Sequence, residues 1–373
     1  LSRKAMLSAA RRFSPLLRTR THTRSAVVAM VANSALADVK DGAFQRQQAG
    51  WRDQITPDGR FQPEAGRYHL YVSLACPWAN RCLAVLYMKG LEDVIGVSVT
   101  HPTWQRTRPN DVADEHCGWV FASPSDPPLA SSSGQGSFPC DACVPDTVNG
   151  AKTVRELYEK AGQQGGRYTV PVLWDKKEGT IVNNESSEIL RMFNASFNHL
   201  AKHPQLDLYP EPLRAEIDAV NEWVYPCINN GVYRCGFATK QAAYEEAFRE
   251  LFSALDRCEG ILAKQRYIAG PRITEADIRL YMTLIRFDEV YVVYFKTNRD
   301  FIRNYPNLSN YVRELYQVPG IGRSTNMYHI KTHYFTSHPT LNHYAIVPVG
   351  GPHWWAEPHD RDAKFPATSA SSV

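Results

Sequence analysis

The strongest constraint on how this chain folds is the order of the first seven elements that its sequence predicts. Residues 68–74 are apolar and rich in β-forming side chains, which indicates a buried strand. The other six are a helix over 79–89 that ends at Gly90, a strand over 94–99, a helix over 151–161, strands over 168–174 and 180–182, and a helix over 185–193. Few folds share the order strand, helix, strand, helix, strand, strand, helix.

That order is typical of the thioredoxin fold, and a proline near the start of the third strand agrees with it. Pro171 lies within the predicted strand 168–174, where a missing N–H argues against a central position. An X–Pro bond is the linkage at which a cis peptide costs least. We therefore expect a cis Val170–Pro171 bond, with a trans proline on an edge strand as the alternative.

The second half of the chain predicts helices alone. Strand signals end near residue 205, and helical patterns follow over 211–229, 240–264, 274–287, 300–316 and 321–331. The sequence therefore predicts an α/β thioredoxin-like N-terminal domain followed by an all-α C-terminal domain. We expect the first domain over 38–204 with a surface-loop insert at 122–146, the second over 205–350, and a mostly irregular tail over 351–373.

The leading segment, residues 1–37, differs in composition from the rest. It holds seven Arg and Lys residues, many hydroxyl side chains and no Asp or Glu. This composition is typical of a transit peptide, so we expect delivery to a chloroplast or mitochondrion. The alternative is a disordered tail without a targeting signal, in which case the protein is cytoplasmic.

Charge and hydropathy exclude two classes of partner. The whole chain carries 42 basic and 38 acidic residues; without the seven basic residues of 1–37, 35 basic and 38 acidic residues remain. Residues 38–373 therefore have no excess of basic side chains with which to bind nucleic acid. No run of 18 apolar residues predicts a membrane span. The eight scattered cysteines are too few for a disulfide scaffold and indicate a reducing compartment.

Cys76 is the strongest candidate for chemistry. It stands between a predicted strand and a helix that begins with Pro77. Free backbone N–H groups and the helix dipole at such a position favour the thiolate and lower the thiol pKa from about 8.5. A lone cysteine is more often a small buried core residue, but this position favours a nucleophile that attacks sulfur. Ala79 stands where a dithiol motif needs a second cysteine, so we expect glutathione to supply the second thiol.

A second pair of cysteines has weaker support. Cys140 and Cys143 have two-residue spacing, but no strand precedes them and the surrounding loop is rich in proline. A zinc site there would need further ligands such as His116 and Cys117. We expect no metal and no bound cofactor, with glutathione as a co-substrate.

The start of the helix after the fourth strand predicts an anion site. Backbone N–H groups near Glu185 and Ser186 can bind a carboxylate, and the Glu185 side chain can pair with an ammonium group. A simple helix cap is the alternative. Arg167, just before Pro171, is placed to bind another carboxylate.

Several motifs resemble those of the glutathionyl-hydroquinone reductases, the Xi class of glutathione transferases. The resemblance covers about residues 40–352. Its motifs are Cys76-Pro77-Trp78-Ala79 with Arg81, Gly118-Trp119, Asn149–Lys152, Thr169–Asp175, Asn184–Ser186, Asn230–Tyr233, Arg286–Asp288, Tyr305–Leu308 and His329–Lys331. Asn80 departs from the pattern, since relatives commonly carry His there.

The resemblance implies a reaction and a set of roles. Members of this family reduce glutathionyl-hydroquinones with glutathione and release the hydroquinone and glutathione disulfide. Cys76 would attack the substrate sulfur and form a mixed disulfide. The resemblance also implies a homodimer. The glutathione-binding residues would be Trp119, Arg167, Val170 (through its backbone), Glu185 and Ser186, and the quinol ring would lie among Tyr233, Tyr291 and Tyr334.

Two alternatives remain open at this point. One is a general thioltransferase or dehydroascorbate reductase on the same fold, which would have no need of three tyrosines. The other is a non-catalytic transferase-like module that binds partners, which would have no need of Cys76 before Pro77 together with Glu185 and Ser186. The physiological quinone and the role of the 122–146 insert are not predicted by the sequence.

Overall fold

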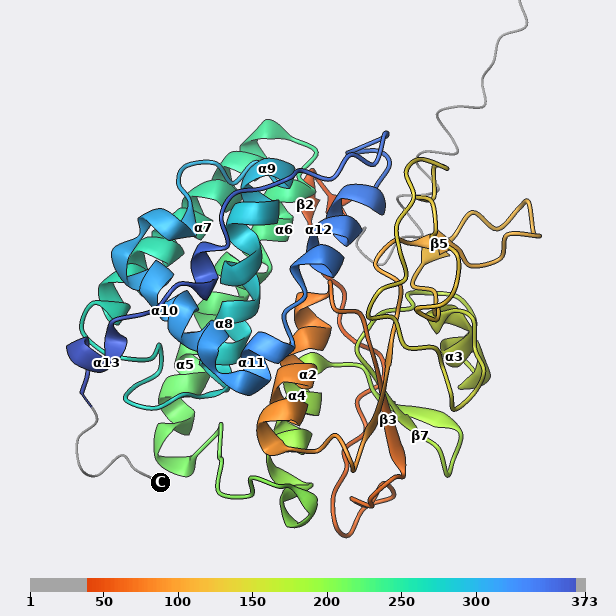
Figure 1. Cartoon of the computed structure of the whole chain (residues 1–373), viewed down its shortest axis with the longest axis horizontal. Coiled ribbons are helices and arrows are strands. Elements are labelled where there is room, and N and C mark those ends of the chain that lie inside the picture. The colour runs from red at the N-terminus through yellow and green to blue at the C-terminus, as the bar shows by residue number, and fades with distance from the viewer. Residues whose placement is uncertain (1–38, 367–373) are drawn as a thin grey trace, which may run out of the picture.

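The computed structural model describes residues 39–366, so the predicted transit segment 1–37 lies outside the described residues, as do the last residues of the tail, 367–373. A small mixed sheet with its helices forms one side of the molecule and a bundle of helices forms the other (Figure 1). The strands are β1 (Val39–Lys40), β2 (Ala43–Phe44), β3 (Tyr68–Val72), β4 (Gly96–Val99), β5 (Gln105–Arg106), β6 (Cys117–Gly118), β7 (Val172–Asp175) and β8 (Thr180–Asn183).

The central sheet has the strand order β4-β3-β7-β8. Strand β3 runs parallel to β4, with Leu70 opposite Val97, and antiparallel to β7, with Leu70 opposite Leu173. Helices α2 (Pro77–Lys89) and α4 (Ser186–Ala195) pack together on the side of the sheet that faces the helical half, and α3 (Val154–Lys160) lies on the other side (Figure 1). All five residues of β3 are buried, which is why that strand reads as a continuous apolar run. The predicted thioredoxin-like fold is confirmed.

Three boundaries in this half follow from local chemistry. The predicted strand 168–174 begins only at Val172, because Pro171 has no N–H to donate, and the Val170–Pro171 bond is cis as expected. Helix α3 begins at Val154 rather than at 151, since the Thr153 side chain accepts a hydrogen bond from the Glu156 N–H and caps the helix. Gly90 ends α2 in the left-handed conformation, at φ 65°.

The second half is all-helical, as predicted, but two of its segments are divided. The helical pattern over 211–229 breaks into an α-helix and a π-turn, and the pattern over 300–316 yields a helix only from Pro306. The elements are η2 (Glu211–Leu213), α5 (Arg214–Val224), η3 (Tyr225–Asn229), α6 (Gly231–Gly236), α7 (Gln241–Leu262), α8 (Glu275–Arg286), η4 (Phe287–Tyr291), α9 (Val292–Tyr294), η5 (Ile302–Asn304), α10 (Pro306–Gln317), α11 (Pro319–Arg323) and α12 (Met327–Thr336).

The prediction of one short helix over 321–331 was wrong. The chain forms α11 and α12 instead, separated at residues 324–326. The Asn326 side chain accepts a hydrogen bond from the His329 N–H at 2.9 Å, which starts a new helix. As a result α12 continues to Thr336 and carries Tyr334 toward the first half of the chain.

The insert and the tail are packed against the body rather than free at the surface. Within 122–146, Val144 pairs with Val99 at the end of β4, and Cys140 and Cys143 are buried in a small cluster of their own. The His329 Nε2 atom lies 2.6 Å from the carbonyl oxygen of Asp141, which joins the insert to α12. The tail forms η6 (Trp354–Ala356) and α13 (Arg361–Lys364), with both tryptophans buried. The tail thus carries two short helices, and the insert is more than a surface loop because it buries its own apolar side chains.

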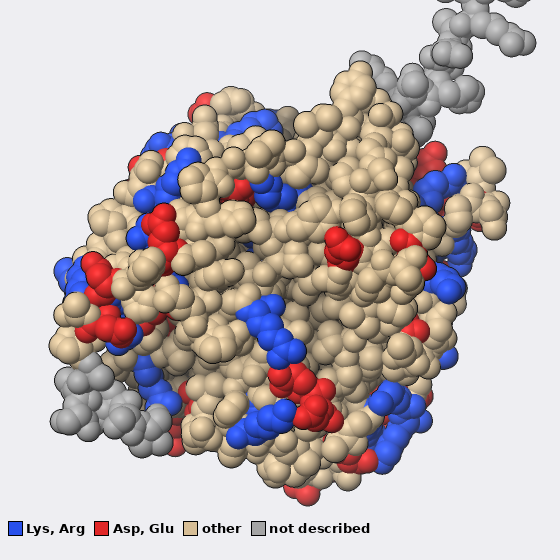
Figure 2. All heavy atoms as spheres, in the orientation of Figure 1, with Lys and Arg blue, Asp and Glu red and all other residues tan. Residues whose placement is uncertain are grey.

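The surface agrees with the near-balanced charge of the body. On the face shown in Figure 2, acidic and basic side chains lie interspersed and form no large patch of a single charge. Within residues 39–366, none of the helices combines the length and hydropathy that crossing a lipid bilayer requires.

Candidate active site

Cys76 lies at the junction that the sequence predicts, between β3 and α2. Its backbone is extended, at φ −76° and ψ 117°, and forms the N-cap of α2. The sulfur is near the backbone N–H groups of Trp78 and Ala79, and the thiol donates to the carbonyl oxygen of Val170 at 3.5 Å. Cys76 keeps 8% of its surface exposed. The cysteine is thus buried but has a face open to the pocket described below.

The expectation that the Cys76 pKa lies below its usual value was wrong for this state of the site. Burial raises the pKa of the thiol, because the low-dielectric surroundings penalise the thiolate. The two backbone N–H groups and the positive charges of Arg286 and Arg46 act in the opposite direction, and they only partly offset burial. The helix position contributes as predicted, but desolvation is the larger effect.

The pocket that holds Cys76 has a volume of about 290 Å³. It contains all five predicted glutathione-binding residues: one directly follows β6, two precede β7, and two are at the start of α4. It also contains two of the three predicted tyrosines. The predicted residues that line it are Cys76, Trp119, Arg167, Val170, Glu185, Ser186, Tyr233 and Tyr334. The structure therefore brings eight of the nine together in one pocket.

Glu185 and Ser186 open α4 as predicted. Glu185 is the N-cap, and its Oε1 atom accepts from the N–H of Ser187 at 2.9 Å and from the Ser187 hydroxyl at 2.8 Å. Both bonds use the same carboxylate oxygen. The side chain therefore caps the helix, and its carboxylate also borders the pocket with Ser186.

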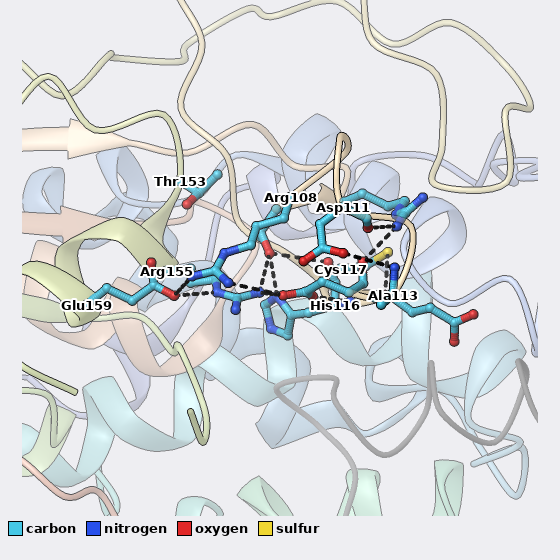
Figure 3. A network of polar contacts seen from close by, with 12 residues as sticks. Arg108, Asp111, Ala113, His116, Cys117, Thr153, Arg155 and Glu159 are labelled. Carbon is cyan, nitrogen blue, oxygen red and sulfur yellow. Dashed lines mark hydrogen bonds and ion pairs between the residues drawn. The ribbon is translucent and has the colours of Figure 1, made fainter. Parts of the chain in front are cut away.

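An aromatic wall closes another side of the pocket. Trp119 follows β6 directly and stacks on the ring of His333 of α12, with centroids 4.4 Å apart. The loop between β5 and β6 is held by a network of ion pairs (Figure 3). In this network Arg155 of α3 lies 2.6 Å from Asp114 Oδ2 and 2.7 Å from Glu159 Oε1. Strand β6 and the tryptophan after it thus have a fixed support.

The three tyrosines meet through their hydroxyl groups. The Tyr334 oxygen lies 2.6 Å from that of Tyr233 and 3.0 Å from that of Tyr291. All three are buried, and burial raises the pKa of each, so the hydroxyls are protonated near neutral pH. Tyr291 is not among the residues that line the pocket and contacts it through Tyr334 and the ring of Tyr233. The predicted trio is therefore a connected group with two members at the pocket.

Sequence reasoning missed Arg46. The guanidinium carbon of Arg46 lies 4.6 Å from the centroid of Trp78 and 4.8 Å from that of Tyr233, and its Nε donates to Asn230 Oδ1 at 2.9 Å. Its Nη2 is buried and has no hydrogen-bond partner within residues 39–366. Arg46 follows β2, before the first predicted element, so no strand or helix pattern could have marked it. Trp104, Tyr225 and His333 also line the pocket and were not predicted as site residues.

Asn80 and Cys82 have structural roles in α2. The Asn80 amide donates to the carbonyl oxygens of Leu74 and Ser324, at 2.8 and 3.1 Å, and so ties the helix to the second half. Cys82 is fully buried, and its thiol contacts the Ser186 carbonyl oxygen at 3.5 Å. Within residues 39–366, no group of three or more His, Cys, Asp or Glu side chains is placed to hold a metal ion.

Comparisons with known proteins agree with the fold and the pocket. Family profiles described as the glutathione S-transferase N-terminal and C-terminal domains match residues 75–196 and 241–314. A curated relative, the glutathionyl-hydroquinone reductase YqjG of Escherichia coli, is 44% identical over 333 residues, which make up 87% of this chain and 94% of the relative. The glutathionyl-hydroquinone reductase PcpF of Sphingobium chlorophenolicum is 44% identical over 310 residues, covering 83% and 90%.

Solved structures give the same result. The glutathione S-transferase Xi of Phanerochaete chrysosporium has a TM-score of 0.75 and 51% identity, over 85% of this chain and 100% of the other. The glutathione-bound structure of Escherichia coli YqjG has a TM-score of 0.76 and 43% identity, over 88% and 100%. Fold and pocket together define a glutathione S-transferase with a cysteine at the start of α2. Within that class, the chain belongs to the Xi family, the glutathionyl-hydroquinone reductases.

Proposed function

We propose that this protein reduces glutathionyl-hydroquinones with glutathione, and that Cys76 forms a mixed disulfide on the way. The observation that carries the proposal is that one pocket presents a cysteine sulfur together with the hydroxyls of Tyr233 and Tyr334. Sulfur attack needs the first group, and protonation of an aromatic leaving group needs the second. The names of the curated relatives support the same reaction.

In the first step the Cys76 thiolate attacks the sulfur of the substrate's glutathionyl group. A disulfide bond forms between Cys76 and glutathione, and the bond from that sulfur to the ring carbon breaks. The ring carbon keeps the electron pair and takes up one proton, which gives the hydroquinone. The thiol proton of Cys76 balances the proton that the ring gains, so this step needs no further reductant.

The tyrosine hydroxyls are suited to deliver that proton. Three hydroxyls carry three protons, and the two contacts among Tyr233, Tyr334 and Tyr291 use two of them. One proton stays available for a group in the pocket. When Tyr291 donates to Tyr334 and Tyr334 donates to Tyr233, the available proton is on Tyr233, which lines the pocket.

In the second step a second glutathione thiolate attacks the mixed disulfide and releases glutathione disulfide and the Cys76 thiol. Cys82 cannot resolve the mixed disulfide, because it is buried against Ser186 and burial raises its pKa well above the usual value. The glutathionyl group would be held by Trp119, Arg167, Val170, Glu185 and Ser186. If glutathione pairs with the Val170 carbonyl, the Cys76 thiol loses its acceptor, and its pKa falls toward the working range.

Assay of the purified protein on glutathionyl-menadiol or a glutathionyl-benzohydroquinone tests this proposal. Release of hydroquinone and glutathione disulfide in equal amounts is expected. Cys76→Ala should abolish the reaction, since no other sulfur from residues 39–366 lines the pocket, whereas the matched control Cys82→Ala should retain most of the activity. Substantial turnover by Cys76→Ala would refute the mechanism.

We also propose that the protein is a homodimer, as the family resemblance implies. Light scattering on the purified protein should give about twice the chain mass of 42.2 kDa. A mass of one chain at micromolar concentration would contradict this proposal.

Residues 1–37 are proposed to direct import into a chloroplast or mitochondrion, on the basis of their Arg-rich, acid-free composition. A fluorescent protein fused behind this segment should enter one of these organelles. A fusion that remains cytosolic would refute the targeting role.

A further inference from the structure

A second cavity, of about 200 Å³, shares one wall with the Cys76 pocket. Trp104 lines both cavities. The rest of the second cavity comes from β1, from β6, from Ser132 of the insert, from the end of α6 and the segment after it, and from the residues that follow α12. Its lining is mostly apolar and includes Val39, Phe237, Ala238 and Leu341. Neither Cys76 nor any predicted glutathione-binding residue takes part, so this cavity is distinct from the active site.

Three buried polar atoms in the lining lack a partner. The indole Nε1 of Trp104, the imidazole Nε2 of His338 and the Ser132 Oγ make no hydrogen bond within the described part of the chain. Trp104 is 1% exposed and His338 is 7% exposed. Buried polar groups are nearly always paired, because an unpaired one loses its hydrogen bonds to water without replacement. The cavity therefore offers three unmet hydrogen-bonding groups within an apolar lining, and two of them, Trp104 Nε1 and His338 Nε2, are on rings that contact each other.

The chemistry of these two atoms is complementary. Burial lowers the pKa of His338 to about 4, so the ring is neutral near pH 7. Its Nδ1 lies 3.4 Å from the carbonyl oxygen of Tyr334, which can only accept, so Nδ1 carries the proton and Nε2 is an acceptor. The indole N–H of Trp104 can only donate. The two rings are in edge contact, with centroids 5.1 Å apart, so the two nitrogens belong to neighbouring side chains of the lining.

We propose that this cavity binds a single-ring phenol, whose hydroxyl donates to His338 Nε2 and accepts from the Trp104 indole N–H. A hydroxyl is the smallest group that both donates and accepts, and an aromatic ring suits the apolar lining. The volume of the cavity is sufficient for one aromatic ring, since an apolar cavity of about 150 Å³ is large enough for benzene. Binding at this site needs no step of the proposed reaction. A hydroquinone is itself a phenol, so the product class of that reaction belongs to the same ligand chemistry.

Isothermal titration of the full-length protein, saturated with glutathione, tests the proposal with phenol as the probe. One saturable phenol site per chain is expected, and benzene should bind about fivefold more weakly because it lacks the hydroxyl. Phenol binding should persist in Cys76→Ala protein saturated with a glutathionyl-hydroquinone. Phenol that this substrate displaces would belong to the Cys76 pocket and would overturn the proposal.

Variants locate the site. Ala238→Phe fills the cavity and should weaken phenol binding at least tenfold, while glutathione affinity stays unchanged. Ala242→Phe makes the same chemical change on the exposed side of α7 and should leave phenol binding intact. His338→Phe removes the acceptor and should reduce the preference for phenol over benzene about fivefold. No saturable binding in the wild type, with ordered water on the two nitrogens in a crystal structure, would refute the proposal.

Discussion

The hydroxyl group of Tyr334 is the centre of a three-tyrosine contact, and this makes a double-mutant cycle informative. Tyr334→Phe removes both contacts, whereas Tyr291→Phe removes only the 3.0 Å contact between the two. If Tyr334 holds the Tyr233 hydroxyl in place to donate to charge that develops on the quinol, its loss should cost about 2 kcal/mol in the transition state, or roughly 30-fold in kcat. The Tyr291 hydroxyl contacts that of Tyr334, so loss of this hydrogen bond in Tyr291→Phe should cost about 1 kcal/mol, or roughly fivefold.

The double variant Tyr291→Phe/Tyr334→Phe should behave like Tyr334→Phe alone, because Tyr291 has then lost the group through which it acts. The coupling energy is then about −1 kcal/mol. Steady-state kcat on a glutathionyl-hydroquinone, with both substrates varied, gives the three values. On a mixed-disulfide substrate without a ring, all three variants should match the wild type. Additive losses in the double variant would refute the proposed connection between Tyr291 and Tyr334.

Tyr294 supplies a matched control for this cycle. Its ring centroid lies 6.4 Å from that of Tyr334, and its hydroxyl is buried without a hydrogen-bond partner in the described residues. Tyr294→Phe therefore deletes a tyrosine hydroxyl in the same region without breaking a contact. It should leave kcat within about twofold and should not lower the free energy of unfolding, measured by urea denaturation.

Three further predictions concern charge, glutathione binding and stability. Arg46→Met should move the rise of kcat/KM with pH upward by roughly one unit, because the charge of Arg46 favours the Cys76 thiolate; an unchanged profile would contradict this role. Ser186→Ala should raise the KM for glutathione several-fold with kcat nearly unchanged, and a fall in kcat alone would argue against glutathione binding. Arg67→Ala should lower the free energy of unfolding by about 3–5 kcal/mol in urea titrations, because it leaves the carboxylate of Asp175 buried without its ion pair; a loss below 1 kcal/mol would show that the carboxylate is satisfied in other ways.

The sequence was informative where local pattern decides structure. The strand–cysteine–proline–helix junction was predictable, because proline at the first helical position and glycine after the last one have fixed backbone preferences. The Glu185 cap was predictable for the same reason. Contact between Tyr233 and Tyr334, which lie 101 residues apart, came from family resemblance and not from any local pattern.

Other features depend on burial that a sequence does not display. The direction in which the Cys76 pKa is shifted is one such feature, because the helix position is a local property and desolvation is a property of the whole fold. Arg46 is another, since its contacts come from α2 and α6 although its own segment has no pattern. The break between α11 and α12 had a local signal, the Asn326 cap, which the apolar periodicity of 321–331 obscured.

The π-turn η4, between Arg286 and Val292, imposes a requirement on length. Arg286 donates to the carbonyl oxygen of Ala75, next to Cys76, and Tyr291 at the far end of the turn contacts Tyr334. Each residue advances a helix by about 100°, so loss of one residue here would rotate Tyr291 by that angle away from Tyr334. A one-residue gap would therefore separate the two contacts that the turn holds in register. Alignments of active members should show no deletions in this turn.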